Sequence, residues 1–454
     1  MVALPVSTPA WAQDALFYHI YPLGLCGAPW RNDFYAEPEP RLNLVGDWIQ
    51  HLVALGVTAV YIGPLWEAGS HGYDTVSYWD VDRRLGSRAT LQNLVRQFHQ
   101  QQIRVVLDAV FNHVGREFFA FASLRRLGRD SPYASWFEGL RFDKRSPQGD
   151  PFWYEGWKDH YDLAKLNLHE PEVRLHLLEA VRHWIEAYDI DGLRLDAADC
   201  LDKGFLAELT AFCRRLRPDF WLMGEVVMGD YSSWGLDAIT NYEFYDSLHK
   251  SHSQQDYTPL GATLERQYGA QGQYRTQPLY NFADNHDVNR IASLVKRGGQ
   301  LYPLHITLMT VPGIPSLYYG SEAGLEGKRL RWSDRPLRPF LPHPRALQDC
   351  RHRDLLPALQ TLASIRHAQP ALRSGSYRTL VAKGPVLAFE RRLGAQRMLV
   401  LVNQAKESQQ LDLSPFIDAS DSWQDLLNSN QRFGAKDLSD LSVHPHWGRI
   451  LQSV

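Results

Sequence analysis

The sequence predicts an α/β protein built on a (β/α)8 TIM barrel. Short apolar runs alternate with helical patterns through most of the 454 residues, and eight such units follow one another in chain order. Apolar strands that alternate with helices are typical of a parallel sheet covered by helices, and eight units favour closure into a barrel. A doubly wound open sheet is the alternative, but no Gly-rich nucleotide-binding motif follows the first strand.

The first half of the predicted barrel contains four strands, each a short apolar run, and four helices with amphipathic patterns. Gly56 ends the first of these helices. The expected strands are residues 15–21, 59–65, 104–110 and 193–197. The expected helices are residues 44–55, 91–102, 172–188 and 205–216.

The second half has weaker patterns, but four more strands can be placed in it. These strands are residues 220–226, 238–245, 279–283 and 314–319. Helical patterns cover residues 301–311 and 353–367. Together the two halves supply the eight strands that a closed barrel needs.

Two segments fall outside the alternating pattern. Residues 115–170 form a long insertion after the third strand, and a structureless loop of that length is improbable in a compact domain. After residue 375, two apolar runs flank Arg391–Ala395 and predict a hairpin. We therefore expect a barrel from residues 1–114 and 171–374, an inserted subdomain from 115–170, and a C-terminal antiparallel β domain from 375–454.

The composition excludes several classes of protein. Apolar residues make up 44% and charged residues 22% of the chain, which is typical of a soluble globular protein and excludes dominant disorder. The net charge of −3 gives no basic footprint for nucleic acid, and no apolar run is long enough to span a membrane. We expect no nucleic-acid partner and no membrane partner.

The cysteines and the N-terminus bear on the cellular compartment. The four cysteines lie far apart, so neither a zinc site nor a disulfide framework is indicated, and we expect buried reduced thiols: Cys26, Cys200, Cys213 and Cys350. Residues 10–12 resemble a signal-peptidase site, but no Lys or Arg precedes them and residues 2–6 are too short for an apolar signal core. We therefore expect a cytoplasmic protein.

Carboxylates follow the third, fourth, fifth and seventh strands. A TIM barrel carries its chemistry at the C-terminal ends of its strands, so these acids are expected to share one cleft: Asp108, Asp196, Glu225, Asp284 and Asp287. Carboxylates in one cleft suit glycosidic cleavage, in which one acts as nucleophile and another as general acid. They also suit metal binding, which is the chemical alternative.

Basic side chains interleaved with these acids favour sugar over metal. Arg194 precedes Asp196 by two residues on a strand, so both side chains face the same way, and we expect the guanidinium to keep Asp196 ionised. An arginine there would compete with a metal ion. His113 and His286 lie beside the other acids and suit sugar hydroxyls.

These motifs resemble glycoside hydrolase family 13, the α-amylase family. The resemblance rests on DAVFNH at 108–113, GLRLDAAD at 192–199, MGEV at 223–226, FADNHD at 282–287 and HGYD at 71–74. It implies that Asp196 is the nucleophile, that Glu225 is the general acid and base, and that Asp287 binds and distorts the sugar at the cleavage subsite. It also implies that His113, His286 and Arg194 bind at this site, that Tyr73 stacks under the sugar, and that Asp108 stands behind them and fixes Arg194.

Lys165 and its surroundings place the chain closest to one branch of that family. The LAKLN stretch at 163–167 resembles the family's fifth region, where many α-amylases have a calcium-binding Asp in place of the lysine. An ammonium repels a cation, so we expect no metal and no cofactor. Lysine there resembles the neopullulanase, cyclomaltodextrinase and maltogenic amylase branch, although Val226–Met228 departs from its pattern.

The resemblance implies a retaining hydrolase of α-1,4 links in short or cyclic maltodextrins, with pullulan and starch as further substrates and some transglycosylation. The alternatives are an α-glucosyltransferase or isomerase of the same family and a non-catalytic glucan-binding scaffold. Four tryptophans are candidate sugar platforms: Trp66, Trp153, Trp157 and Trp234. About 13 residues precede the first strand, so we expect a monomer, or a dimer not mediated by an N-terminal domain.

Overall fold

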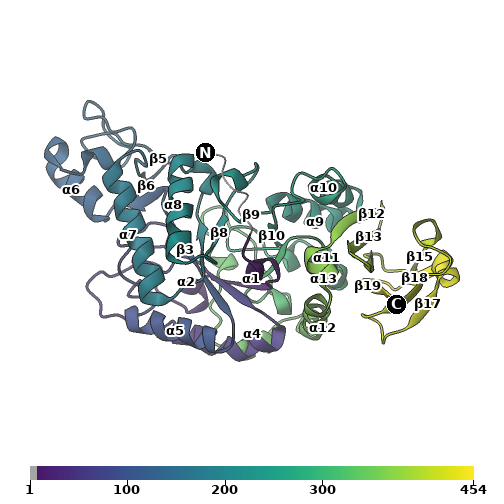
Figure 1. Cartoon of the computed structure of the whole chain (residues 1–454). Helices are drawn as coiled ribbons and strands as arrows, with labels where there is room; N and C mark the ends of the chain where they lie inside the picture. Colours follow the sequence, from purple (N-terminus) through teal and green to yellow (C-terminus); the bar gives the residue numbers. More distant parts are fainter. Residues whose placement is uncertain (1–7) are drawn as a thin grey trace.

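Eight parallel strands close into a barrel in the computed structural model, which describes residues 8–454 (Figure 1). Their order around the barrel is β1-β11-β10-β9-β8-β7-β3-β2. The strands are β1 (Phe17–Ile20), β2 (Ala59–Ile62), β3 (Arg104–Ala109), β7 (Gly192–Leu195), β8 (Trp221–Gly224), β9 (Ala238–Thr240), β10 (Leu279–Phe282) and β11 (Ile314–Tyr318). The predicted TIM barrel is therefore confirmed. Residues 2–6, which the sequence analysis found too short for an apolar signal core, lie outside the described residues.

Helices surround this barrel and differ from the prediction at two points. They are α4 (Ile49–Leu55), α5 (Arg88–Gln100), α7 (Pro171–Tyr188), α8 (Lys203–Leu216), α9 (Tyr242–Gln254), α10 (Thr258–Tyr268), α11 (Leu301–Thr310) and α12 (Leu355–Ala368). The helix expected at 44–55 is divided into α3 (Asn43–Gly46) and α4. The strand expected at 238–245 is wrong beyond Thr240, because the Asn241 side chain accepts a hydrogen bond from Phe244 N and caps α9.

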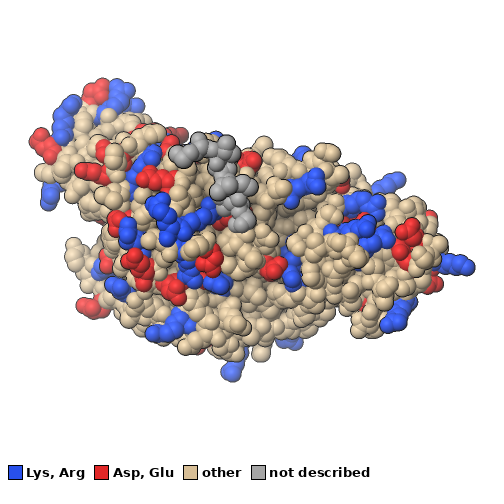
Figure 2. All heavy atoms as spheres, in the orientation of Figure 1, with Lys and Arg blue, Asp and Glu red and all other residues tan. Residues whose placement is uncertain are grey.

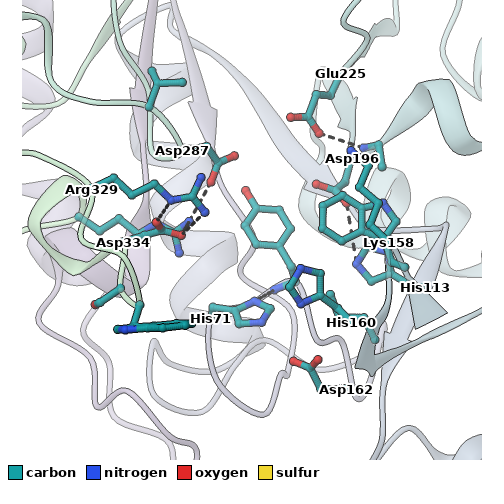
Figure 3. Close-up of a pocket in the computed structure, with 18 of the residues that line it drawn as sticks. His71, His113, Lys158, His160, Asp162, Asp196, Glu225, Asp287, Arg329 and Asp334 are labelled. Carbon is teal, nitrogen blue, oxygen red and sulfur yellow. Dashed lines mark hydrogen bonds and ion pairs between the residues drawn. The ribbon is translucent and has the colours of Figure 1, made fainter. Parts of the chain in front are cut away.

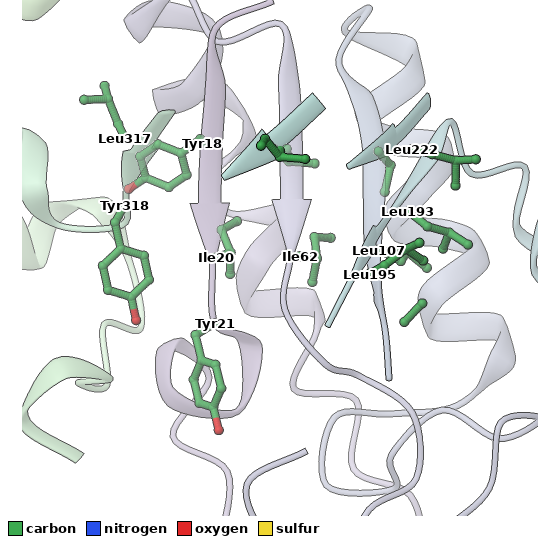
Figure 4. Close-up of a cluster of buried hydrophobic side chains, with 14 of the residues drawn as sticks. Tyr18, Ile20, Tyr21, Ile62, Leu107, Leu193, Leu195, Leu222, Leu317 and Tyr318 are labelled. Atoms are coloured by element: carbon green, nitrogen blue, oxygen red, sulfur yellow. The ribbon is translucent and has the colours of Figure 1, made fainter. Parts of the chain in front are cut away.

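Side chains alternate between the barrel interior and the surrounding helices. Tyr18, Ile20, Leu107, Leu193 and Leu222 belong to a large buried cluster between the strands and the helices (Figure 4). Alternate residues of the barrel strands belong to a separate buried cluster: Phe17, Ala59, Val106, Trp221, Met223 and Tyr280. Polar residues of the same inward faces lie one step further along the strands: His19, Asp108 and Arg194. The barrel is thus closed by apolar packing below and presents polar groups at its C-terminal end.

The insertion after β3 forms a small three-stranded sheet in the order β4-β6-β5. Its elements are β4 (His113–Gly115), α6 (Phe119–Leu127), β5 (Gly156–Trp157) and β6 (His160–Lys165). The insertion projects from one side of the barrel, at the upper left of Figure 1. Because β4 begins with His113, the sheet grows directly out of the polar end of β3.

The C-terminal segment forms a six-stranded antiparallel sheet and a separate two-stranded one, as the sequence predicted. The strands are β12 (Ser376–Lys383), β13 (Val386–Leu393), β14 (Gln396–Asn403), β15 (Gln409–Leu411), β16 (Ser422–Asp425), β17 (Arg432–Gly434), β18 (Leu441–Val443) and β19 (Trp447–Ser453). The predicted hairpin is β13 and β14. Buried Arg391 of β13 reaches out of this sheet and donates to Thr310 O of α11 (2.6 Å) and Leu372 O of α13, Pro370–Ser374 (2.8 Å).

Surface charge and the cysteines add two observations. Positive and negative side chains are interspersed on the face shown in Figure 2. All four cysteines are free, and Cys26 and Cys213 are buried as expected, but Cys200 is exposed and Cys350 is half-buried. The expectation of four buried thiols is therefore wrong for these two.

Within residues 8–454, no helix has the length and apolar character needed to cross a membrane.

Two buried histidines predict a loss of stability in acid. Burial lowers the pKa of His252 and of His305 to about 4, and each ring donates to a backbone carbonyl, at 2.8 Å and 2.7 Å. The unfolded chain takes up these protons below pH 6.5, whereas the folded chain does so only near pH 4, so stability is lost as the pH falls through that window. At pH 5 each histidine is expected to contribute about 2 kcal/mol to this loss.

The measurement is urea unfolding of His305→Gln and of the parent at pH 7.5 and pH 5. The difference in unfolding free energy between the two pH values should be smaller in the variant. The same change at exposed His444 is the control and should leave the difference unaltered. An equal pH dependence in the parent and in His305→Gln contradicts the assignment.

Candidate active site

A pocket of about 560 Å³ opens where the barrel strands end. It brings together the three carboxylates predicted to be catalytic: Asp196 after β7, Glu225 after β8 and Asp287 after β10. Figure 3 shows Asp287 across the pocket from Asp196 and Glu225. Tyr73 and His113 also line the pocket, as predicted, whereas Arg194, His286 and Asp108 lie behind its wall.

Arg194 joins the two carboxylates on one side of the pocket. Its Nη1 lies 2.8 Å from Asp196 Oδ1 and 2.9 Å from Asp108 Oδ1, and its Nη2 lies 2.8 Å from Glu225 Oε2. The guanidinium is buried, and its rigid fork fixes the directions of its donors. Asp196 and Glu225 are therefore held close together by one planar group, and Asp108 contacts the same guanidinium from behind.

The electrostatics of this cluster are balanced between opposing influences. Burial raises the pKa of Asp196 above its ordinary value, the Arg194 guanidinium opposes that rise, and the Glu225 and Asp108 carboxylates add to it. Three carboxylates share one guanidinium, so the single positive charge of Arg194 is divided among them. The expectation that Arg194 keeps Asp196 ionised describes only one of these influences.

Asp287 has a different environment. Arg338 Nη2 lies 2.9 Å from its Oδ1, and His286 Nε2 lies 3.0 Å from its Oδ2. Burial alone would raise the pKa of Asp287, but His286 and Arg338 hold it well below its ordinary value. Asp287 is therefore ionised at neutral pH, with one face of its carboxylate open to the pocket.

Tyr73 and His113 form part of the floor and wall between the carboxylates. The Tyr73 ring is stacked on His286 with ring centres 5.5 Å apart, and its hydroxyl donates to Asp108 at 3.2 Å. His113 Nε2 lies 4.0 Å from Asp196 Oδ2 and has no hydrogen-bond partner among the described residues. Burial lowers the pKa of His113 to about 3, so this ring is neutral at pH 7.

The sequence family described as "Alpha amylase, catalytic domain" matches residues 41–338, which is more than half of the chain. A cyclomaltodextrinase from Bacillus sp is 32% identical over 423 residues, covering 88% of this chain and 74% of that protein. Neopullulanase 2 from Thermoactinomyces vulgaris is 30% identical over 474 residues, covering 98% of this chain and 78% of that protein. The chain belongs to the α-amylase family. It is a glycoside hydrolase of that family, as the sequence motifs predicted.

Solved structures agree with this assignment. A cyclomaltodextrinase superposes with a TM-score of 0.87 at 29% identity, covering 99% of this chain and 79% of that one. A debranching enzyme from Nostoc punctiforme gives a TM-score of 0.80 at 27% identity, covering 98% and 99% of the two chains. The barrel, the insertion and the C-terminal sheet are therefore an arrangement that other α-amylase family enzymes share.

Two polar contacts of this α-amylase family site escaped the sequence analysis. Tyr242, on the first turn of α9, donates from its hydroxyl to Glu225 Oε1 at 3.0 Å. Arg338 follows β11 by twenty residues (338 − 318) and reaches Asp287. Tyr242 was assigned to a strand, and Arg338 lies in a segment without helical or strand periodicity, so no local signal marked either one.

The four tryptophans expected as sugar platforms differ in whether they line the pocket. Only Trp157 of the four lines the pocket. Trp66 is buried and stacked on Trp184, so its assignment as a platform is wrong. Trp153 and Trp234 also lie outside the pocket lining, whereas two tryptophans that the sequence analysis missed do line it: Trp30 and Trp332.

Lys165, the position where many α-amylases have a calcium ligand, forms an ion pair with Glu155 at 2.7 Å. Both partners are on the insertion, and both are partly exposed. Within residues 8–454, no group of three or more His, Cys, Asp and Glu side chains is arranged to hold a metal ion. The Lys165 ammonium is thus neutralised by Glu155 of the same insertion.

Proposed function

We propose that this protein is a retaining α-glucan hydrolase that cleaves α-1,4-glucosidic bonds in short or cyclic maltodextrins. The observation that carries the proposal is the bonding of Asp196 and Glu225 to the two nitrogens of one guanidinium at the pocket wall. Retaining glycosidases need their two carboxyl groups only about 5–5.5 Å apart, because no water stands between nucleophile and sugar. A shared arginine supports that short separation.

The proposed chemistry uses the three carboxylates in different roles. Asp196 attacks the anomeric carbon and forms the glycosyl-enzyme, while Glu225 donates its proton to the leaving oxygen. Glu225 then takes a proton from the water that hydrolyses the intermediate. Glu225 is proposed to carry the proton for the leaving oxygen at the start of the cycle, as a general acid must.

Five further residues belong to the proposed sugar-binding site at the cleavage subsite. Ionised Asp287 accepts from two sugar hydroxyls, and Tyr73 lies under the ring. His113 supports this role because its Nε2 is buried without a partner next to Asp196. His286 and Arg194 act from behind the pocket wall, so direct contacts between them and the sugar stay a prediction.

The substrate class rests on the pocket and on the relatives. Neighbours in sequence include cyclomaltodextrinases and a neopullulanase, and a pocket of about 560 Å³ suits a few sugar rings.

We infer a barrel at 1–114 and 171–374 that holds the acids, an insertion at 115–170 that walls the pocket, and a β domain at 375–454. We further propose a cytoplasmic protein that is a monomer or a dimer built from surfaces outside the pocket.

The test is a product profile on β-cyclodextrin, pullulan, starch and maltotriose. We expect maltose and glucose from β-cyclodextrin, with the α anomer formed first. Reactions with and without added glucose as an acceptor separate hydrolysis from transfer, since a glucosyltransferase gives mainly longer or rearranged products. Formation of the β anomer first, or no turnover of any α-glucan, contradicts the proposal.

A further inference from the structure

The tip of the β5–β6 hairpin has an unusual backbone for the residues that form it. Trp157 pairs with His160, so only Lys158 and Asp159 make the turn. Their φ angles are +45° and +64°, both in the left-handed region. Such a pair is typical of a type I′ turn, for which Asn-Gly is strongly preferred because other side chains strain the backbone there.

Lys158 therefore occupies a position for which its own backbone preference is poor. Its side chain lines the catalytic pocket, whereas Asp159 is not among the described residues of the lining (Figure 3). Strained positions are kept where the side chain has a function that a better turn former cannot supply. Because only Lys158 of the two turn residues lines the pocket, the reason for keeping this strained turn lies in the Lys158 side chain.

The Lys158 ammonium is available to a ligand. It lies 4.8 Å from the centre of the Trp157 ring, and within residues 8–454 no ion pair includes it. Lys165 of the same hairpin, by contrast, is paired with Glu155 at 2.7 Å. An exposed ammonium has three N–H donors, and sugar hydroxyls are suitable acceptors for them.

Neighbouring contacts place Lys158 on one side of the scissile bond. The backbone N–H of Ala197 donates to Glu225 Oε2 at 3.0 Å, and Asp199, two residues later, lines the pocket. Lys158 lines the same pocket and lies on the side of Asp196 and Glu225, across from Asp287 (Figure 3). Lys158 thus lies beside the segment that holds the proposed general acid, which is where the leaving group must be.

We propose that Lys158 is a specificity-determining residue that donates hydrogen bonds to the sugar on the leaving-group side of the scissile bond. The strained turn is retained because it directs this ammonium into the pocket next to Trp157. The inference rests on the proposed function, since it requires a glycosidic bond between the carboxylates. Substrates that carry a sugar as leaving group should depend on Lys158, and substrates with an aryl leaving group should not.

The test compares Lys158→Asn with Asp159→Gly as its matched control. Both changes suit the left-handed turn, so both should keep or raise the melting temperature. For Lys158→Asn, kcat/KM on maltotetraose should fall at least about tenfold, the usual loss for a hydrogen bond from a charged group. Release of nitrophenol from p-nitrophenyl α-maltoside should stay within about twofold of the parent. This substrate has no sugar on the leaving-group side, so Lys158 makes no hydrogen bond there that the substitution could remove.

One further variant completes the test. Asp159→Gly should match the parent on both substrates, and Lys158→Arg should recover most of the maltotetraose activity because it keeps the charge. A lower melting temperature in Lys158→Asn overturns the proposal in favour of a structural contact with Trp157. Equal losses on both substrates, or no loss, also overturn it. If the parent protein itself turns over neither substrate, the proposed function has failed rather than this inference.

Discussion

Asp196→Asn should abolish turnover, with kcat lowered by about 10⁴-fold or more, because the amide cannot form the glycosyl-enzyme. The fold should survive. Burial and the neighbouring carboxylates raise the pKa of Asp196, so its ionised form is disfavoured in the folded protein and a neutral amide relieves that strain. We therefore expect a melting temperature equal to or above that of the parent.

The measurement is initial rate on maltotriose together with thermal unfolding of the same samples. Asp219→Asn is the matched control, since it makes the same chemical change at a half-exposed acid just before β8, at the opposite end of the barrel. It should keep activity within about twofold. A folded Asp196→Asn protein that retains more than a few per cent of parent activity rejects Asp196 as the nucleophile.

Glu225→Gln should show an effect that depends on the leaving group. Loss of a general acid lowers rates by about 10²–10⁴-fold, and a sugar leaving group needs its proton more than nitrophenolate does. Maltotriose hydrolysis should therefore fall by the full amount. With p-nitrophenyl α-maltoside the first step should survive better than the second, so a burst of nitrophenol equal to the enzyme concentration is expected.

Stopped-flow absorbance on the chromogenic substrate, compared with steady-state rates on maltotriose, makes this measurement. Glu208→Gln, a partly exposed acid on α8 that pairs with Arg174, is the control and should behave as the parent. Equal losses on both substrates, with no burst, contradict the role of Glu225 as the acid. Such a result would leave Asp196 as nucleophile untouched, so the two experiments test separate parts of the mechanism.

Much of this site could be predicted because strand ends in a parallel barrel converge. Asp196 and Glu225 follow clearly apolar strands and Asp287 follows a weaker one, so the sequence alone predicted that they share one rim. Tyr242 could not be found in this way, since residues 238–245 read as one continuous strand. A single hydrogen bond from Phe244 N to the Asn241 side chain ends that strand and starts a helix, which is a local detail weaker than the apolar pattern.

Arg338 and the turn at Lys158 were out of reach for a different reason. Arg338 reaches the site through tertiary contacts, because its partners Asp287 and Tyr21 lie far away in the chain. The sequence at Lys158 and Asp159 has neither the glycine nor the asparagine that normally marks a tight hairpin. A residue that is kept for its function can lack the local sequence preference of the turn that it forms, so a prediction from local preferences misses that turn.

Arg391 ties the C-terminal sheet to the cooperativity of the whole molecule. Burial lowers the pKa of this guanidinium to about 9, and its donors are taken up by carbonyls at the ends of α11 and α13. Separating the sheet from the barrel would leave both the guanidinium charge and those carbonyls without partners, which would cost several kcal/mol of free energy. The sheet is therefore no interchangeable module: it should melt together with the barrel in one calorimetric transition, and a sheet grafted from a relative would have to bring an arginine of its own to that position.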